Sequence, residues 1–495
     1  MEIIAKKAEL FLQKSDLTAV FIFQDQKKSS SSSSIIKTQV GKILVARMEN
    51  DRFVGKANSV FLTHSENISV AKHLAVVGLG YAENFSTEVV RQATACVINL
   101  AKEIGAKNIA MPLLRANNEI ASECARAMVE GARLADYVYD KFKKASNKSP
   151  KNLTIVCEDG RDLRAAQKGI GIGEAMARAT MFARDLVNSP AQETHPERLV
   201  EIAREIVKKK SHLKVKVYDW SALKKMGAGG ILGVGQGSEF PPYLVHLIYK
   251  PKQNCKKRIA LVGKAVTFDS GGLSLKPADA MVNMKIDMAG AAAVLGAFSQ
   301  IEKFSPNVEV HGIFAAVENM PSGHAIRPGD ILTALDKKTI EVVNTDAEGR
   351  ITLADSLVFA CKQKPTYIVD IATLTGACMT ALGEEVSGFM SNNDKLSALL
   401  EGVAKKSGEK VWSLPLEKNY RKLLKSNVAD MQNLGNGWGG ALTAGLFLEE
   451  FVCNIPWAHI DIAGPSFAER DIDPYTRKGA TGHGTRMLLE LILSM

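Results

Sequence analysis

The sequence lacks the features that mark secreted and membrane-embedded proteins. Its first stretch, MEIIAKKAELFLQKSD, has no uninterrupted apolar core and no small-residue cleavage site, so we do not expect a secretory signal. No later apolar run is long enough to span a bilayer. The seven cysteines are scattered and form no C-x-x-C pair, which is typical of reduced thiols. These absences predict a cytoplasmic protein with no membrane partner.

No glycine cluster completes the G-x-G-x-x-G pattern of a dinucleotide-binding turn. Glu174 stands where the third glycine would follow Gly169 and Gly171, and the run at 227–237 fails the same spacing test. The net charge of +10 comes from widely spread basic residues, with only short lysine clusters. We interpret these residues as a solvated surface, with attraction to nucleic acid or membrane as the alternative.

The length of 495 residues exceeds the size at which one hydrophobic core usually stops growing. Hydrophobic residues make up 46% of the chain and charged residues 23%, which is typical of folded globular proteins. We therefore predict two domains. An N-terminal α/β domain is expected at 1–162, a connecting helix at 163–187 and a catalytic domain at 188–495.

The N-terminal part alternates short apolar strands with amphipathic helices, as a small α/β domain does. Six serines at 29–34 are interpreted as a flexible surface loop. No chemistry is visible in this part. The expected strands are Leu17–Phe23, Lys42–Arg47, Leu74–Leu79, Asn108–Leu113 and Leu153–Glu158, and the expected helices are Ser86–Ile104 and Asn118–Lys141.

The C-terminal part repeats the order strand then helix, and several of its strands are almost entirely apolar. This pattern predicts a mainly parallel sheet flanked by helices, in which sites form beyond the carboxyl ends of the strands. The expected strands are Arg258–Gly263, Val308–Val317, Thr366–Ala372 and Trp457–Ala463, and the expected helices are Ala289–Glu302, Leu353–Gln363, Asp394–Lys406 and Thr485–Leu493.

Acidic and basic side chains gather where these strands end. The loop expected after Arg258–Gly263 carries two lysines and an aspartate, and a second aspartate precedes the next helix; a later loop carries Asp346-Ala-Glu348-Gly-Arg350. Four carboxylates brought together without cations would repel one another strongly, so a shared site requires metal ions or bases. The seven candidate residues are Lys264, Asp269, Lys276, Asp287, Asp346, Glu348 and Arg350.

Histidine and cysteine are absent from both acidic loops. Neither a Ser-His-Asp arrangement nor a histidine zinc triad follows from the local spacing. Oxygen ligands favour Mn²⁺, Mg²⁺ or Zn²⁺, and a pair of such ions polarises a carbonyl and activates water near neutral pH. The residues alone therefore predict a two-metal hydrolase and leave peptidase, phosphatase and nuclease open. The alternative is that the acids cap helices or pair with the three bases.

Asn344-Thr-Asp-Ala-Glu-Gly-Arg350 resembles the signature of the leucyl (cytosol) aminopeptidase family. The likeness is strengthened by Gly263–Gly272, by Glu318–Pro321 with Arg327–Asp330, and by further stretches. It covers most of the chain after about residue 165, whereas the N-terminal part resembles the family only in general layout. The further matching stretches are Gly233–Ser238, Asp370–Ala377 and Asp461–Gly464.

The resemblance implies a metal-dependent exopeptidase with two divalent ions, Mn²⁺ or Zn²⁺. Lys264, Asp269, Asp287 and Glu348 would hold one ion, and Asp346 would hold the other together with the shared Asp269 and Glu348. A lysine ligand must be neutral to donate its lone pair, and two adjacent cations would depress its pKa.

The same likeness assigns the catalytic roles. The ammonium of Lys276 would stabilise the developing oxyanion. Arg350 would hold a bicarbonate ion acting as the general base on metal-bound water, which explains proton transfer without histidine. An arginine that only closes the Asp346 loop is the alternative. An apolar slot for the first side chain, suited to leucine, would be lined by substrate-binding residues Met284, Asn344, Thr373, Leu374, Gly376 and Ala463.

The family resemblance also implies a homohexamer whose sites face an interior space, which would restrict substrates to short peptides. Some family members also bind DNA, so a competing hypothesis places function in a basic, DNA-binding N-terminal domain. An inactive structural relative is a third hypothesis, disfavoured because all seven site residues are present.

Overall fold

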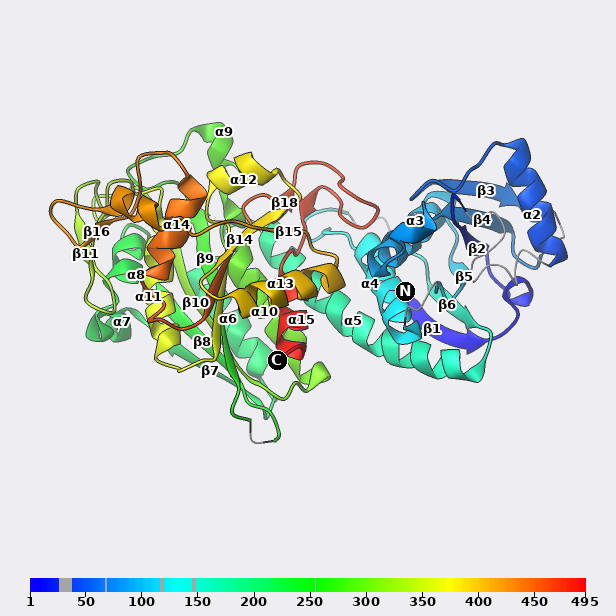
Figure 1. Cartoon of the computed structure of the whole chain (residues 1–495), viewed down its shortest axis with the longest axis horizontal. Helices are drawn as coiled ribbons and strands as arrows, with labels where there is room; N and C mark the ends of the chain where they lie inside the picture. Colours follow the sequence, from blue (N-terminus) through cyan, green and yellow to red (C-terminus); the bar gives the residue numbers. More distant parts are fainter. Residues whose placement is uncertain (26–37, 67–68, 116–119, 145–147, 254) are drawn as a thin grey trace. The chain divides into compact units, whose positions relative to one another are not determined.

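The computed structural model describes the chain except residues 26–37, 67–68, 116–119, 145–147 and 254 (Figure 1). The described residues form two compact units. Unit 1 comprises residues 1–178 and 470–477, and unit 2 comprises 179–469 and 478–495. Helix α5 (Gly160–Asn188) occupies the stretch where we predict a connecting helix, and the division between the units falls within it.

Unit 1 is built on a sheet with strand order β1-β6-β5-β2-β4-β3, parallel except for the β3–β4 pair. Its two long helices, α3 and α4, pack against each other. The elements are β1 (Glu2–Lys7), β2 (Leu17–Ile22), α2 (Gln39–Asn50), β3 (Val60–His64), β4 (His73–Gly78), α3 (Thr87–Ile104), β5 (Asn108–Pro112), α4 (Ala121–Asp136) and β6 (Asn152–Cys157).

The strand predicted at Lys42–Arg47 is wrong, because these residues lie inside helix α2. Thr38 caps the helix by accepting a hydrogen bond from the backbone N–H of Gly41, and Gly41, Leu44 and Met48 form its buried face. The helical spacing of these three residues decides the element. The serine run at 29–34 lies outside the described residues.

Unit 2 contains an eight-stranded sheet among its described residues, in the order β15-β14-β17-β13-β9-β10-β8-β7. The four central strands, β17, β13, β9 and β10, are parallel, as predicted. Its strands are β7 (Leu213–Tyr218), β8 (Tyr243–Tyr249), β9 (Arg258–Asp269), β10 (Glu309–Asn319), β13 (Tyr367–Ala372), β14 (Ser387–Ser391), β15 (Val411–Ser413) and β17 (Trp457–Asp461), with short strands β11 (Ile331–Thr333), β12 (Thr339–Glu341), β16 (Met431–Gln432), β18 (Phe467–Ala468) and β19 (Gly479–Ala480).

Helices cover both faces of this sheet (Figure 1). One face packs against α8, α11 and α14 through alternate strand residues such as Ala260 and Val262. The other packs against α6, α10 and α13, and α15 packs against α10 and α13. The elements are α6 (Pro196–Val207), α7 (Trp220–Met226), α8 (Gly229–Gly235), α9 (Ala278–Met281), α10 (Ala289–Phe304), α11 (Glu348–Cys361), α12 (Gly376–Leu382), α13 (Asp394–Ser407), α14 (Gly440–Glu449) and α15 (Thr485–Leu493).

Strand β9 is longer than predicted and carries Lys264 and Asp269 on the strand itself rather than on a following loop. Residues five apart on a regular strand point to opposite faces. Here the register against β10 slips: Val266 pairs with Val317, but Asp269 pairs with Asn319. The extra residue on β9 forms a bulge, which turns Asp269 to the same face as Lys264.

Contrary to our expectation from the sequence, one stretch, Ala278–Phe304, is apolar and long enough, by length and composition alone, to cross a membrane. Its most apolar part is 67% buried within the protein, because α10 packs directly against the sheet and α15. A helix that is hydrophobic on nearly all sides is expected in the core of a large domain. We therefore interpret this apolar stretch as core packing.

Gly290 at the start of α10 allows this helix to approach the sheet closely. A Cβ there would lie 2.0 Å from the Ile371 carbonyl oxygen and 2.8 Å from the Lys264 backbone nitrogen. Gly290→Ala should therefore lower the free energy of unfolding by about 1–3 kcal/mol. Urea unfolding followed by tryptophan fluorescence measures this, since all four tryptophans belong to unit 2.

Gly402→Ala is the matched control for this substitution. Gly402 lies on the exposed side of α13, and a Cβ there would meet no atom within 4 Å. The control should leave stability unchanged or raise it by up to about 1 kcal/mol, because alanine favours a helix over glycine. Equal losses in the two variants would contradict the close approach at Gly290.

Candidate metal centre

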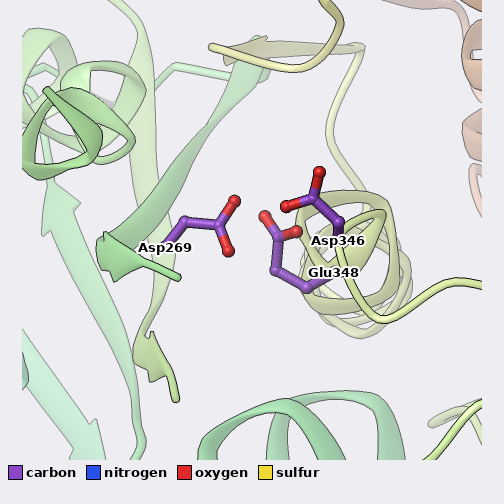
Figure 2. Close-up of side chains that lie close together, drawn as sticks. All are labelled: Asp269, Asp346 and Glu348. Atoms are coloured by element: carbon purple, nitrogen blue, oxygen red, sulfur yellow. The ribbon is translucent and has the colours of Figure 1, made fainter. Parts of the chain in front are cut away.

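Three carboxylates, one from the end of a strand and two from the start of a helix and the loop before it, meet at the carboxyl edge of the unit 2 sheet. Asp269 ends β9, Glu348 opens α11, and Asp346 lies two residues before Glu348. One oxygen from each lies within 4.8 Å of the others, and Figure 2 shows all three side chains turned toward a common point. Asp269 and Glu348 are buried and Asp346 is partly buried. The two predicted acidic loops thus supply one cluster.

Lys264 and Asp287 complete the buried side of this cluster. The Lys264 ammonium lies 2.8 Å from Asp287 Oδ1 and 3.0 Å from Glu348 Oε1, and it donates to the Thr373 carbonyl oxygen at 3.1 Å. Burial alone would lower the pKa of Lys264, but the charges of Asp287, Glu348 and Asp269 outweigh it and raise that pKa. Without metal ions, Lys264 is therefore a cation that compensates the acids.

Lys276 neutralises the more open side. Its ammonium lies 3.0 Å from Asp269 Oδ2 and 2.5 Å from Asp346 Oδ1. Burial opposes the charge, but these two carboxylates raise the pKa of Lys276 above its ordinary value. Its side chain is 15% exposed, against 4% for Lys264. Lys276 therefore stays protonated and lies nearer to solvent.

The surroundings of Glu348 and Asp287 raise the pKa values of both acids. Burial, reinforced by the charge of Asp269, raises the pKa of Glu348 to about 8, although Lys264 opposes the shift. Burial likewise raises the pKa of Asp287 to about 6 against the pull of Lys264. Two lysines therefore do not fully compensate four gathered carboxylates. A dication at this point would relieve the remaining repulsion.

Unsatisfied oxygens also fit a metal ion. Among the described residues, Asp287 Oδ2 and Glu348 Oε2 are buried and have no hydrogen-bond partner. A buried carboxylate oxygen without a partner is costly unless a cation binds it. The set of carboxylates and one amine, without thiolates, suits a hard or borderline divalent ion. The residues present therefore fit the metal that the sequence predicts.

Helix α11 begins at Glu348, earlier than the predicted start at Leu353. The first turn of a helix leaves backbone N–H groups unpaired, and a carboxylate there is favoured by the helix dipole. The same turn carries Arg350, which is buried and donates from Nη1 to the Asn433 carbonyl oxygen at 2.9 Å. Burial lowers the pKa of Arg350 to about 10, so the guanidinium remains charged at neutral pH.

The residues predicted to bind substrate fall into several short segments of unit 2. Met284 lies in a 3-10 turn before α10, and Thr373, Leu374 and Gly376 follow β13. Thr373 Oγ1 donates to Asp287 Oδ1 at 2.8 Å, so this residue contacts the acidic cluster directly. A Cβ on Gly376 would meet nothing within 4 Å, which leaves open space beside it.

Ala463 and Asn344 are held by hydrogen bonds to the site. The buried Asp461 carboxylate accepts from the backbone N–H groups of Leu374 at 3.1 Å and Ala463 at 3.1 Å, which ties the segments after β13 and β17 together. Asn344 Oδ1 accepts from the Asp346 backbone N–H at 2.7 Å. Asn344 therefore shapes the acidic loop in this structure.

Sequence reasoning missed the neutral side chains that orient these acids. Asn319, buried at the end of β10, donates from Nδ2 to Asp269 Oδ1 at 2.8 Å and to the Thr345 carbonyl oxygen at 3.0 Å. Asn319 lies inside the Glu318–Pro321 stretch that carries the family resemblance. Only the pairing of β10 with β9, however, places it beside Asp269.

The chain matches a known family over nearly its whole length. The profile described as "Cytosol aminopeptidase family, catalytic domain" matches residues 181–489, and the profile for the N-terminal domain of the same family matches residues 19–146. The chain belongs to the cytosol aminopeptidase family. Membership makes it a metal-dependent aminopeptidase, a hydrolase that acts on peptides.

Curated relatives and solved structures agree over the full chain. It is 42% identical to a probable cytosol aminopeptidase of Trichormus variabilis, covering 97% of each chain, and 40% identical to one of Aquifex aeolicus, covering 100% of this chain and 99% of the relative. A tomato leucine aminopeptidase mutant aligns with a TM-score of 0.89 at 36% identity, covering 100% of this chain and 97% of the other. The bottromycin maturation enzyme BotP in complex with Mn aligns at 0.85 and 33% identity, covering 97% and 99%.

The raised pKa values predict how the metal-free protein responds to pH. Glu348 and Asp287 hold protons in the folded state at pH values where the unfolded chain has lost them, so their contribution to stability is lost as pH rises from about 4 to about 8. Glu348→Gln mimics the protonated acid. In the presence of a chelator it should raise the melting temperature relative to the parent at pH 8 but not at pH 5.

Thermal melts of both proteins at the two pH values measure this difference. Excess Mn²⁺ should stabilise the parent more at pH 8 than at pH 5, because metal ligands must be deprotonated, and Glu348→Gln should lose that gain. Glu401→Gln, an exposed acid on α13, is the control and should follow the parent throughout. If Glu348→Gln changed the melting temperature equally at both pH values, this would refute a raised pKa for the buried Glu348 carboxyl.

Proposed function

We propose that this aminopeptidase releases N-terminal residues, preferably leucine or other apolar residues, from short peptides at a centre of two divalent ions. The observation that carries the proposal is the convergence of four carboxylates and one amine at one sheet edge, with buried oxygens unpaired. An ordinary ion-pair network would satisfy these oxygens.

The ligands divide into two overlapping sets. Lys264, Asp269, Asp287 and Glu348 would hold one ion, and Asp269, Asp346 and Glu348 the other. When bound, two ions of Mn²⁺ or Zn²⁺ supply Lewis acidity and an activated water near neutral pH. To serve as a ligand, Lys264 must release the proton that the acids hold on it, since only the neutral amine donates a lone pair.

Lys276 and Arg350 supply the fixed positive charges. The raised pKa of Lys276 keeps its ammonium charged during turnover, and its partial exposure suits contact with a substrate carbonyl oxygen as negative charge develops there. The Arg350 guanidinium, buried beside the acidic cluster, suits an anion such as bicarbonate. Bicarbonate bound there would supply the general base that the site otherwise lacks.

The preference for apolar first residues rests on the side chains beside the acids. Met284 and Ala463 are apolar, and Gly376 leaves space that a branched aliphatic side chain would fill. Thr373 Oγ1 donates to Asp287 Oδ1, which holds this residue beside the acids. Leu374 would extend the same apolar wall.

The assembly and location are inferred from family resemblance alone. We propose a homohexamer with its sites facing an interior space, which would admit short peptides and exclude folded proteins. A cytoplasmic location agrees with the names of the relatives, which are probable cytosol aminopeptidases. Among the described cysteines none forms a disulfide, as expected in a reducing compartment.

The test is hydrolysis of leucine p-nitroanilide by the full-length protein after chelation and after adding back Mn²⁺ or Zn²⁺. Asp346→Asn should lower kcat/KM by roughly a thousandfold or more, because it removes a metal ligand. Asp394→Asn, at the exposed start of α13, should not change it. Full activity of the chelated protein, or of Asp346→Asn, would refute the two-metal centre.

A further inference from the structure

The loop that carries Asp346 and Glu348 holds negative charges close together. One carboxylate oxygen from each of Asp269, Asp346 and Glu348 lies within 4.8 Å of the others, so their negative charges repel one another. Inside the loop, Asn344 accepts two hydrogen bonds. Its side-chain oxygen accepts from the Asp346 N–H, and its carbonyl oxygen accepts from the Ala347 N–H. An anchor from outside the loop is required to hold its backbone in place against this repulsion.

Asn433 is that anchor. It follows β16, and its side chain is completely buried. Asn433 Oδ1 accepts from the backbone N–H of Val343 at 2.9 Å and of Asn344 at 3.4 Å. Asn433 Nδ2 donates to the carbonyl oxygens of Asn344 at 2.7 Å and Ala347 at 3.3 Å. One amide therefore clasps the loop on both sides of Asp346.

The backbone of Asn433 also contacts a residue of helix α11. Its carbonyl oxygen accepts from Arg350 Nη1 at 2.9 Å, and its N–H donates to the Glu341 carbonyl oxygen at 3.0 Å. Parallel pairing of β16 with β12 continues up to Glu341, which fixes Asn433 where the loop begins. The residue thus binds the start, the middle and the helical end of the acidic segment.

The chemistry of an amide explains why asparagine occupies this position. An amide carries a donor and an acceptor and no charge, so it pairs with N–H and carbonyl groups without adding to the four carboxylates. An aspartate would set an oxygen against the carbonyls of Asn344 and Ala347. An alanine would leave buried backbone groups of the loop without partners, at a cost for each.

We propose that Asn433 is a positioning residue for the metal centre: it orients Asp346 and Glu348 toward Asp269 and holds the Arg350 guanidinium in place. It acts through these residues: among the described residues, its hydrogen bonds join the backbone of the loop, the Glu341 carbonyl oxygen and the Arg350 guanidinium, and none joins an acidic side chain. The inference rests on the proposed function in one respect, that Asp346 and Glu348 are metal ligands.

The test compares Asn433→Ala with Gln432→Ala in the full-length protein. Gln432 is the adjacent residue, and its side-chain amide also makes two bonds to carbonyl oxygens, those of Leu423 at 3.1 Å and Leu434 at 2.8 Å, but none to the acidic loop. Titration of each chelated protein with Mn²⁺, with free Mn²⁺ followed by electron paramagnetic resonance, measures affinity without relying on activity.

Asn433→Ala should weaken Mn²⁺ binding about 10–100-fold, the usual effect of removing an outer partner of metal ligands, whereas Gln432→Ala should bind as the parent does. At saturating Mn²⁺, kcat for leucine p-nitroanilide should fall at least about tenfold with KM nearly unchanged, because the loop that carries Asp346 and Glu348 loses the side-chain amide that orients it, while the proposed pocket residues Met284 and Gly376 are untouched. Unchanged Mn²⁺ affinity in Asn433→Ala, or an equal loss in Gln432→Ala, overturns the proposal.

A second variant and a comparison with the parent protein allow the proposal to be tested in every case. If Asn433→Ala does not fold, Asn433→Ser, which retains a small polar group too short to reach both Val343 and Ala347, should show the same direction of change. If the parent binds Mn²⁺ but does not cleave the anilide, the proposed substrate class fails, while the affinity comparison still decides the role of Asn433.

Discussion

Mutual repulsion of four carboxylates in a buried space is the constraint on which the rest of this structure depends. Burial and proximity raise the pKa values of Glu348 and Asp287, and Lys264 and Lys276 offset only part of the cost. In the metal-free state this repulsion is a cost to the folded domain, and a divalent ion bound among the carboxylates would relieve it and stabilise the fold. Binding chemistry and folding stability are therefore coupled at one point.

The parallel sheet makes this arrangement possible. Its central strands end at one edge, so Asp269 at the end of β9, Asn319 at the end of β10 and Thr373 just after β13 come together although they are far apart in the sequence. The bulge in β9 turns Asp269 toward Lys264, and the start of α11 delivers Glu348. Neutral amides then hold the charged groups in position, Asn319 on one side and Asn433 on the other.

Much of this was predictable where chemistry and periodicity are local. The mainly parallel sheet followed from apolar strands alternating with helices, and the acids and lysines stood out because few structural roles require so many charges at strand ends. Errors arose where local patterns are ambiguous. Lys42–Arg47 has the apolar content of a strand, yet the spacing of its buried residues and the cap at Thr38 make it a helix. The length of β9 was underestimated because charged residues inside a strand resemble a loop.

The sequence by itself determined the class of fold, the family and the set of charged side chains, because these depend on residue type and on short-range spacing. The tertiary structure alone decided which oxygens share a point, which lysine lies deep and which lies near solvent, and that Asn433 clasps the loop around Asp346. The reason is physical: a hydrogen bond between residues about ninety positions apart depends on strand pairing and bulges that no local pattern encodes.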